Sequence, residues 1–111
     1  MFDMSSLNAA KKKAKDNYEK HVGDFESELK EGIELFKSFA DDKNTNTLKK
    51  ASDKFFDAIR SKRSRVEPYI YLSYIFYMLD NNELAIKYLD YAKSIDSTRF
   101  EILELQRMIY G

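Results

Sequence analysis

The longest uncharged stretch of the chain runs from Pro68 to Leu79 and reads Pro-Tyr-Ile-Tyr-Leu-Ser-Tyr-Ile-Phe-Tyr-Met-Leu. Its polar groups are Ser73 and the hydroxyls of four tyrosines. Such a pattern places apolar side chains all round a helix, so it predicts a helix that other segments cover on more than one side. The stretch is too short to cross a bilayer, which takes about 20 apolar residues. Any part of it left uncovered is a candidate binding surface.

Two further helices are predicted downstream of this stretch. Asp80 opens a polar turn, and Asn82 is placed to cap a helix that runs from about 83 to 95. Thr98 and Glu101 then have the spacing of a capping box, which predicts a last helix reaching about Ile109.

Upstream, Thr47 is placed to cap a helix from about 48 to 60, after a polar linker over 41–46. An amphipathic stripe precedes the linker and comprises Phe25, Leu29, Ile33, Phe36 and Ala40. Four glutamates are expected mainly off this stripe: Glu26, Glu28, Glu31 and Glu34. The stripe continues back to Leu7, so residues 7–41 form either one long helix or two helices broken near Gly23. Residues 1–6 are expected to be disordered.

The composition supports a single all-α domain. The 111 residues include one proline and three glycines, where average usage gives about five and eight. Nineteen basic and nineteen acidic residues cancel, so no net field favours nucleic acid or membrane as a partner. The chain has no cysteine, which excludes disulfides and thiolate chemistry. The N-terminal lysine cluster has no apolar stretch behind it, so we expect no secretory signal and a cytoplasmic protein.

An internal repeat appears when the chain is shifted on itself by 34 residues. The shift aligns Ala51 with Ala85, Phe55 with Leu89, and Ala58 with Ala92. The shared pattern is Ala-x-x-x-large-x-x-Ala. Small residues at these positions let the two helices of a hairpin approach closely, and the large residue fills the space between them.

This repeat resembles that of tetratricopeptide-repeat (TPR) proteins, with the pattern W-x-x-L-G-x-x-Y…A-x-x-x-F…P. The best copy matches it at Tyr69, Leu72, Ser73, Phe76, Ala85 and Leu89, with Ser97 in place of the proline. The upstream copy fits at Leu35, Ala51, Phe55 and Ala58 but departs at Ser38, Phe39 and Asp42. A third copy has room only for a first helix, which fits at Leu103 and Tyr110 and departs at Gln106 and Arg107.

The resemblance implies antiparallel helix hairpins stacked in a short right-handed solenoid over residues 29–111. Residues 7–28 would add an N-terminal amphipathic helix. The alternative is a generic helical bundle in which the repeat is a coincidence.

In this family the first helix of each repeat lines a concave groove. The resemblance implies that Tyr69, Leu72, Ser73 and Phe76 face the second helix of their own hairpin. We expect Ile75 and Leu79 to pack on the preceding repeat. The positions left over are the predicted partner-binding residues: Ile70, Tyr71, Tyr74, Tyr77 and Met78, with Ile33, Phe36 and Lys37 from the preceding helix and Glu101, Glu104 and Met108 from the last helix. Tyrosines offer a large contact area and a hydroxyl for a directed hydrogen bond.

The sequence thus predicts a non-enzymatic interaction module or adaptor that binds a partner's peptide or helix in the groove. Lys37, Glu101 and Glu104 would set the register of the bound segment. The alternative is a self-assembling scaffold, for example a homodimer. It would use the N-terminal helix, and a second copy of the chain would fill the groove. The chain's own N-terminal helix, with Tyr18 and Val22, is another occupant to consider.

Other motifs carry no specific chemistry. Two basic clusters, Arg60, Lys62, Arg63 and Arg65, and Lys11, Lys12, Lys13 and Lys15, are expected to be a solvated loop and a solvated helix face. His21 is the single histidine and has no cysteine or carboxylate cluster beside it, so we expect no metal site. No Gly-rich phosphate loop or nucleophile elbow is present, and we expect neither catalysis nor a cofactor.

Overall fold

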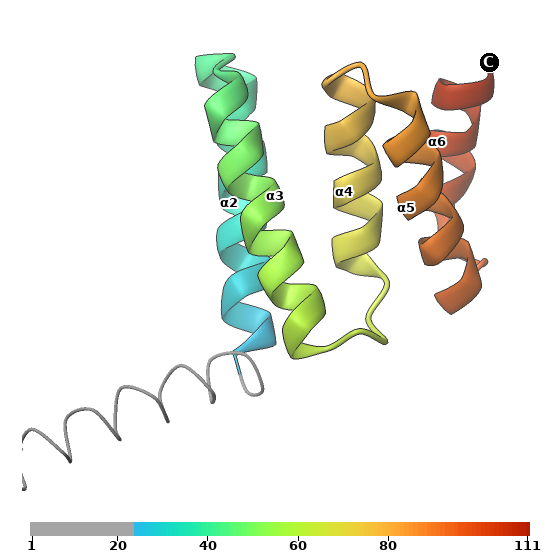
Figure 1. The fold of residues 1–111 in the computed structure, drawn as a ribbon, viewed down its shortest axis with the longest axis horizontal. Helices are drawn as coiled ribbons and strands as arrows, with labels where there is room; N and C mark the ends of the chain where they lie inside the picture. The colour runs from blue at the N-terminus through green and yellow to red at the C-terminus, as the bar shows by residue number, and fades with distance from the viewer. Residues whose placement is uncertain (1–23) are drawn as a thin grey trace, which may run out of the picture.

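The structure is a computed structural model that describes residues 24–111, and this part of the chain contains five α-helices and no strand. The helices are α2 (Phe25–Asp42), α3 (Thr45–Ser61), α4 (Glu67–Met78), α5 (Asn82–Ile95) and α6 (Phe100–Tyr110). In Figure 1, α2 and α3 form one antiparallel pair, α4 and α5 form a second, and α6 lies at the end of the row. The all-α prediction is confirmed for the described residues.

The turn between α2 and α3 differs from the prediction in its cap. Lys43 adopts the left-handed conformation (φ 54°) and donates its N–H to the carbonyl of Phe39. The side chain of Asn44 then accepts a hydrogen bond from the N–H of Asn46, at 2.9 Å, and is the N-cap. Thr47, the predicted cap, lies inside α3 and donates its hydroxyl to Asp42 at 2.8 Å. The prediction was wrong because several residues here can cap, and Asn44 comes first.

The N-cap of α5 is also one residue earlier than predicted. Asp80 has a positive φ of 65°, which ends α4 and turns the chain at once. Asn81 therefore caps α5, and its side chain accepts a hydrogen bond from the N–H of Leu84 at 3.1 Å. Asn82 is the first residue of the helix.

The capping box predicted for the last helix is absent. The Asp96 carboxylate accepts hydrogen bonds from the N–H of Thr98, at 3.0 Å, and from its hydroxyl, at 2.5 Å. The hydroxyl of Thr98 is therefore occupied before the helix begins. Arg99 is the N-cap and makes no side-chain cap, while Glu101 pairs with Arg99 instead.

The N-terminal end of the described chain belongs to the helical core. α2 begins at Phe25, and Phe25 and Leu29 are both buried. The division expected between residues 28 and 29 therefore falls within α2. The expectations for residues 1–6, for the helix over 7–22 and for a break near Gly23 lie outside the described residues.

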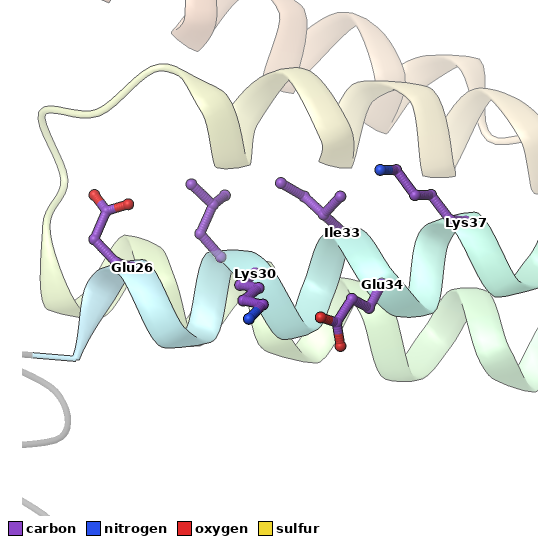
Figure 2. A pocket seen from close by; sticks show the side chains of 6 residues that line it. Glu26, Lys30, Ile33, Glu34 and Lys37 are labelled. Atoms are coloured by element: carbon purple, nitrogen blue, oxygen red, sulfur yellow. The ribbon is translucent and has the colours of Figure 1, made fainter.

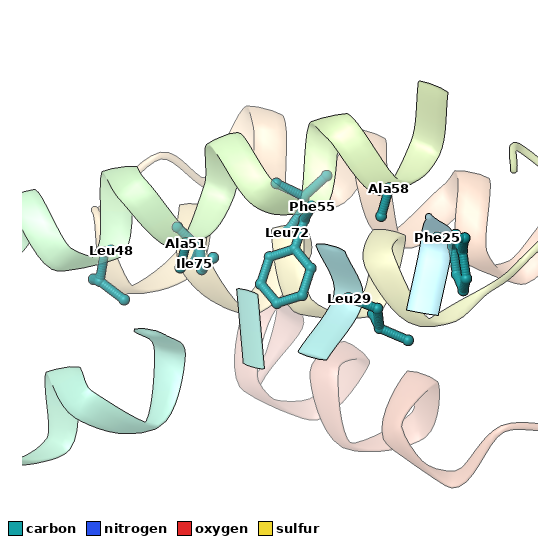
Figure 3. Close-up of a cluster of buried hydrophobic side chains, with 8 residues drawn as sticks. All are labelled: Phe25, Leu29, Leu48, Ala51, Phe55, Ala58, Leu72 and Ile75. Atoms are coloured by element: carbon teal, nitrogen blue, oxygen red, sulfur yellow. The ribbon is translucent and has the colours of Figure 1, made fainter. Parts of the chain in front are cut away.

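The first core cluster joins the first hairpin to α4, as Figure 3 shows. Its fully packed members are Phe25 and Leu29 of α2, Leu48, Ala51, Phe55 and Ala58 of α3, and Leu72 and Ile75 of α4. A Cβ atom built on Gly32 would lie 2.8 Å from the ring of Phe55, so α2 and α3 approach closely at a position where only hydrogen fits. Ile75 is buried together with residues of the preceding hairpin, as expected, and Leu79 packs against the same cluster.

The second core cluster joins α4, α5 and α6. Its buried members are Val66, Tyr69, Ile70, Leu89, Ala92, Ile102 and Leu105. Three of the four positions expected to face the second helix of the hairpin do contact α5. The hydroxyl of Ser73 donates to the carbonyl of Ala85 at 2.7 Å, the ring of Phe76 stacks on that of Tyr88 at 5.5 Å, and the ring of Tyr69 lies 5.8 Å from that of Tyr91. Leu72, the fourth, is buried instead in the first cluster, because α2 and α3 pack on that side of α4. The small residues of the repeat, Ala85 and Ala92, are fully buried.

One glutamate of α2 departs from the predicted polar face. Glu28 is fully buried and accepts a hydrogen bond from the hydroxyl of Ser61 on its Oε1, at 2.7 Å. Among the described residues no hydrogen-bond partner meets its Oε2. The expectation that Glu28 lies off the stripe was wrong, because the end of α3 crosses α2 at this point and covers it.

We predict that Gly32→Ala destabilises the domain by about 1–3 kcal/mol, although alanine favours a helix interior over glycine by about 1 kcal/mol. The added methyl group needs the space of the Phe55 ring, which is buried and stacked on Tyr71. Urea unfolding followed by circular dichroism measures the difference. Ser38→Ala, on the exposed face of α2, is the control and should change stability by less than about 0.5 kcal/mol. Equal stability of Gly32→Ala and the wild type would contradict the packing described.

Candidate functional site: a hollow between three helices

The candidate site is a hollow of about 140 Å³ bounded by α2, α4 and the start of α6. We call it the three-helix hollow, and its lining comprises Ile33, Glu67, Ile70, Tyr71, Tyr74, Arg99 and Glu101. The structure therefore brings together five of the predicted partner-binding residues, Ile33, Ile70, Tyr71, Tyr74 and Glu101. They come from three helices that are far apart in the sequence.

A second, open hollow of about 320 Å³ follows α2 and adjoins the first through Ile33. Its lining comprises Glu26, Leu29, Lys30, Ile33, Glu34 and Lys37. In Figure 2, Ile33 and Lys37 lie on the side of α2 that faces α4, whereas Lys30 and Glu34 point away from α4. The predicted partner residue Lys37 therefore lies along the continuation of the three-helix hollow.

One wall of the hollow is aromatic and consists of Tyr71 and Tyr74. The ring of Tyr71 stacks on that of Phe55, with centroids 4.9 Å apart and planes 4° from parallel. Phe36 meets the same tyrosine edge-on at 5.2 Å and lies 6.3 Å from the ring of Tyr74. Phe36 thus contacts both tyrosines of the wall but is not itself part of the lining. Aromatic pairs in these geometries contribute about 0.5–1.5 kcal/mol beyond their buried area.

Tyr74 connects α4 to α6. Its hydroxyl donates to Oε1 of Glu104. Burial raises the pKa of the Tyr74 hydroxyl, and the hydrogen bond to Glu104 and the negative charge of Glu101 raise it further. The hydroxyl therefore stays protonated at neutral pH and acts as a donor. Glu104, one of the predicted partner-binding residues, therefore contacts a residue of the lining without being part of it.

Ile70 lines the hollow but is not part of the open stripe that was expected. It is only 3% exposed, because α6 packs over it, and it forms the floor of the hollow. Met78 and Met108 are exposed and Tyr77 is half-buried, and all three lie outside both linings. The structure therefore concentrates the candidate site nearer the N-terminal end of α4 than the prediction did.

A charge network that sequence reasoning missed closes one end of the hollow. Arg65 contacts Glu26 of α2 at 2.9 Å and Glu67 of α4 at 3.2 Å. Arg99 lies 3.6 Å from Glu67 and 3.3 Å from Glu101 of α6. Five alternating charges thus join α2, α4 and α6.

A signal for this network was present in the sequence. Arg65 and Glu67 align with Arg99 and Glu101 under the same shift of 34 residues. The pattern Arg-x-Glu therefore precedes or opens both α4 and α6. Arg65 also lies over the ring of Phe25, 4.7 Å from its centroid. Arg60, Lys62 and Arg63 of the basic cluster are exposed, as expected, whereas Arg65 is partly covered by these contacts.

The network shifts the pKa values of its acids. Burial raises the pKa of the Glu67 carboxyl, but hydrogen bonds from Arg65 and the backbone, with the charges of Arg65 and Arg99, outweigh it and leave the pKa below its ordinary value. The hydrogen bond from Arg99 lowers the pKa of Glu101. Both carboxylates are therefore ionised at neutral pH and stay paired with the arginines.

The lining of the hollow offers aromatic rings, carboxylates and a guanidinium group. Within residues 24–111, no group of three acidic, histidine or cysteine side chains is placed to hold a metal ion. His21 lies outside that range. None of the described helices is long and apolar enough to span a bilayer. What the site does offer is a wall of aromatic and apolar side chains beside paired charges of both signs.

We predict that Arg99→Gln lowers the free energy of unfolding at pH 7 by about 1 kcal/mol, because it breaks the bridge from α4 to α6. Lowered carboxyl pKa values give stability that is present above the unfolded pKa, near 4.5, and is lost as pH falls through the folded values. The wild type should therefore lose more stability between pH 6 and about pH 3 than Arg99→Gln does. Urea unfolding at each pH measures this, with Arg63→Gln as control. Parallel pH curves for wild type and Arg99→Gln would contradict it.

Comparison with known proteins adds no assignment. No protein-family model, curated protein or solved structure matches the chain. The function of the three-helix hollow is therefore inferred from its own geometry and chemistry.

Proposed function

We propose that this chain is a non-enzymatic protein-interaction module of the tetratricopeptide-repeat kind, which binds a peptide or helix of a partner protein in a groove along α2, α4 and α6. In such a solenoid these would be the first helices of three successive repeats. The observation that carries the proposal is the three-helix hollow, because all three helices contribute to one surface of aromatic and charged side chains.

The arrangement of the hairpins supports this reading of the fold. α4 packs on α5 through the positions that the repeat pattern assigns to the hairpin contact, including Ser73 and Phe76. The buried alanines of α3 and α5 occur at the same repeat positions. The close approach of Gly32 to Phe55 gives the first hairpin the same tight packing by another residue.

The size of the hollow indicates what it can take. At about 140 Å³ it is smaller than the roughly 300–1,000 Å³ of typical small-molecule sites. It suits one apolar side chain of a longer ligand, placed against Ile33 and Tyr71. The rest of the ligand would continue along α2 over the second hollow, whose lining extends from Glu26 to Lys37.

The charges would then fix the register of the bound segment. Arg99 and Glu101 lie at one end of the groove and Lys37 at the other. A peptide with an apolar anchor flanked by polar residues would match this pattern. Apolar burial would supply affinity at about 25 cal/mol per Å², from which the costs of association are subtracted.

We predict that Ile33→Glu weakens peptide binding at least tenfold, about 1.4 kcal/mol, because it places a carboxylate in the hollow. Peptides selected from a displayed random library on the wild-type domain supply the ligands, and fluorescence anisotropy measures their affinities. The matched control is Ile86→Glu, the same change at a half-buried isoleucine of α5 outside both hollows. Circular dichroism verifies that both variants fold. Selected peptides that bind Ile33→Glu and Ile86→Glu equally would place the binding site elsewhere.

A further inference from the structure

The outer face of α6 carries the most exposed large apolar side chains of the described chain. Phe100, Leu103 and Tyr110 are 69%, 57% and 63% exposed. Together with Arg107 they follow one another at spacings of three, four and three residues, which places them on one side of the helix. The opposite side, with Ile102 and Leu105, is buried in the core. An apolar stripe along a whole helix, unlike scattered single residues, points to an interaction surface. We call it the α6 stripe.

The repeat identifies this stripe as a helix-binding face. Under the shift of 34 residues, Leu103, Arg107 and Tyr110 align with Tyr69, Ser73 and Phe76. Those three residues of α4 make its contacts with α5: a ring pair with Tyr91, a hydrogen bond to Ala85 and a ring stack on Tyr88. Within the described residues α6 has no such partner on this face, and Figure 1 shows it at the end of the row.

We propose that the occupant of the α6 stripe is a second copy of this chain, bound through an antiparallel α6–α6 pair. The 3-4-3 spacing reads the same from either end of the helix. A two-fold axis level with Leu105 therefore brings Phe100 of each copy opposite Tyr110 of the other, and Leu103 opposite Arg107. Such a self-complementary patch is what an isologous dimer needs.

Arg107 selects the antiparallel orientation. In a parallel pair the two Arg107 guanidinium groups would face each other, and like charges in a contact oppose association. In the antiparallel pair each Arg107 lies over Leu103, which the arginine's methylene groups can cover. The antiparallel orientation therefore keeps the two guanidinium groups apart and places each one over an apolar side chain.

The pair is expected to be weak and to leave the candidate site open. α6 has eleven residues, so the pair should bury less than the roughly 800 Å² per partner of a standard interface. The three-helix hollow uses Arg99 and Glu101, which precede and flank the stripe without belonging to it. The dimer would therefore carry two open grooves.

Sedimentation equilibrium tests whether the stripe pairs. The chain has a mass of 13.1 kDa, and we expect the apparent mass to rise toward twice that value between about 10 μM and 1 mM, the range of a weak complex. Leu103→Glu should stay monomeric, because it puts a charge in the apolar contact. The control Lys93→Glu changes charge on the exposed side of α5 and should dimerise like the wild type. A wild type that is monomeric throughout, or a dimer that Leu103→Glu does not change, overturns the proposal.

Disulfide cross-linking tests the orientation without background, because the chain has no cysteine. A mixture of Leu103→Cys and Arg107→Cys under mild oxidation should form the mixed disulfide at least several times faster than either variant forms its own. A mixture of Lys87→Cys and Lys93→Cys on α5 gives the rate of random collision. Faster pairing of position 107 with itself would indicate parallel helices and overturn the antiparallel assignment, as would mixed cross-linking at the collision rate.

Discussion

The rest of this structure depends on the contacts that the ring of Phe55 makes with α2 and α4. One side of the ring fills the space left by Gly32, and its face stacks on Tyr71. A single side chain of α3 thus sets how closely α2 approaches and where α4 lies against the first hairpin. Everything that α4 carries, including the wall of the three-helix hollow and the face that receives α5, is positioned from this ring. Interiors packed this closely do not adjust freely to a change of volume.

The Arg-x-Glu pairs make a second connection between the same helices at the surface. Because Arg65 and Arg99 each contact acids of two segments, the starts of α4 and α6 are held at a fixed separation. The hollow is therefore bounded by packing on its inner side and by ion pairs at its end. A partly buried network of this kind contributes modestly to stability, but it fixes the directions of the charges that a ligand would meet.

The sequence was sufficient to predict the helices, the hairpin contact of α4 and most of the residues that line the hollow. These follow from local spacing, since a helix places residues three and four apart on one face. It was not sufficient for the caps at Asn44 and Asn81, where neighbouring polar residues compete and the local turn decides. Nor could it show that Glu28 is buried or that Ile70 forms a floor, because both depend on where another helix crosses. The Arg-x-Glu pairs recur at the 34-residue period and could be read in the repeat, but which acids each arginine reaches depends on how α2, α4 and α6 pack.

Tyr71 belongs to the core and to the hollow at once: it stacks on Phe55 while its side chain also lines the candidate site. If the hollow binds a partner as proposed, the affinity for that partner and the stiffness of the domain would not be independent. A ligand that orders Tyr71 also orders the joint between the two hairpins, so an occupied groove should bend less at that joint than an empty one. In a longer assembly, occupancy would be transmitted as a change in the flexibility of the whole unit.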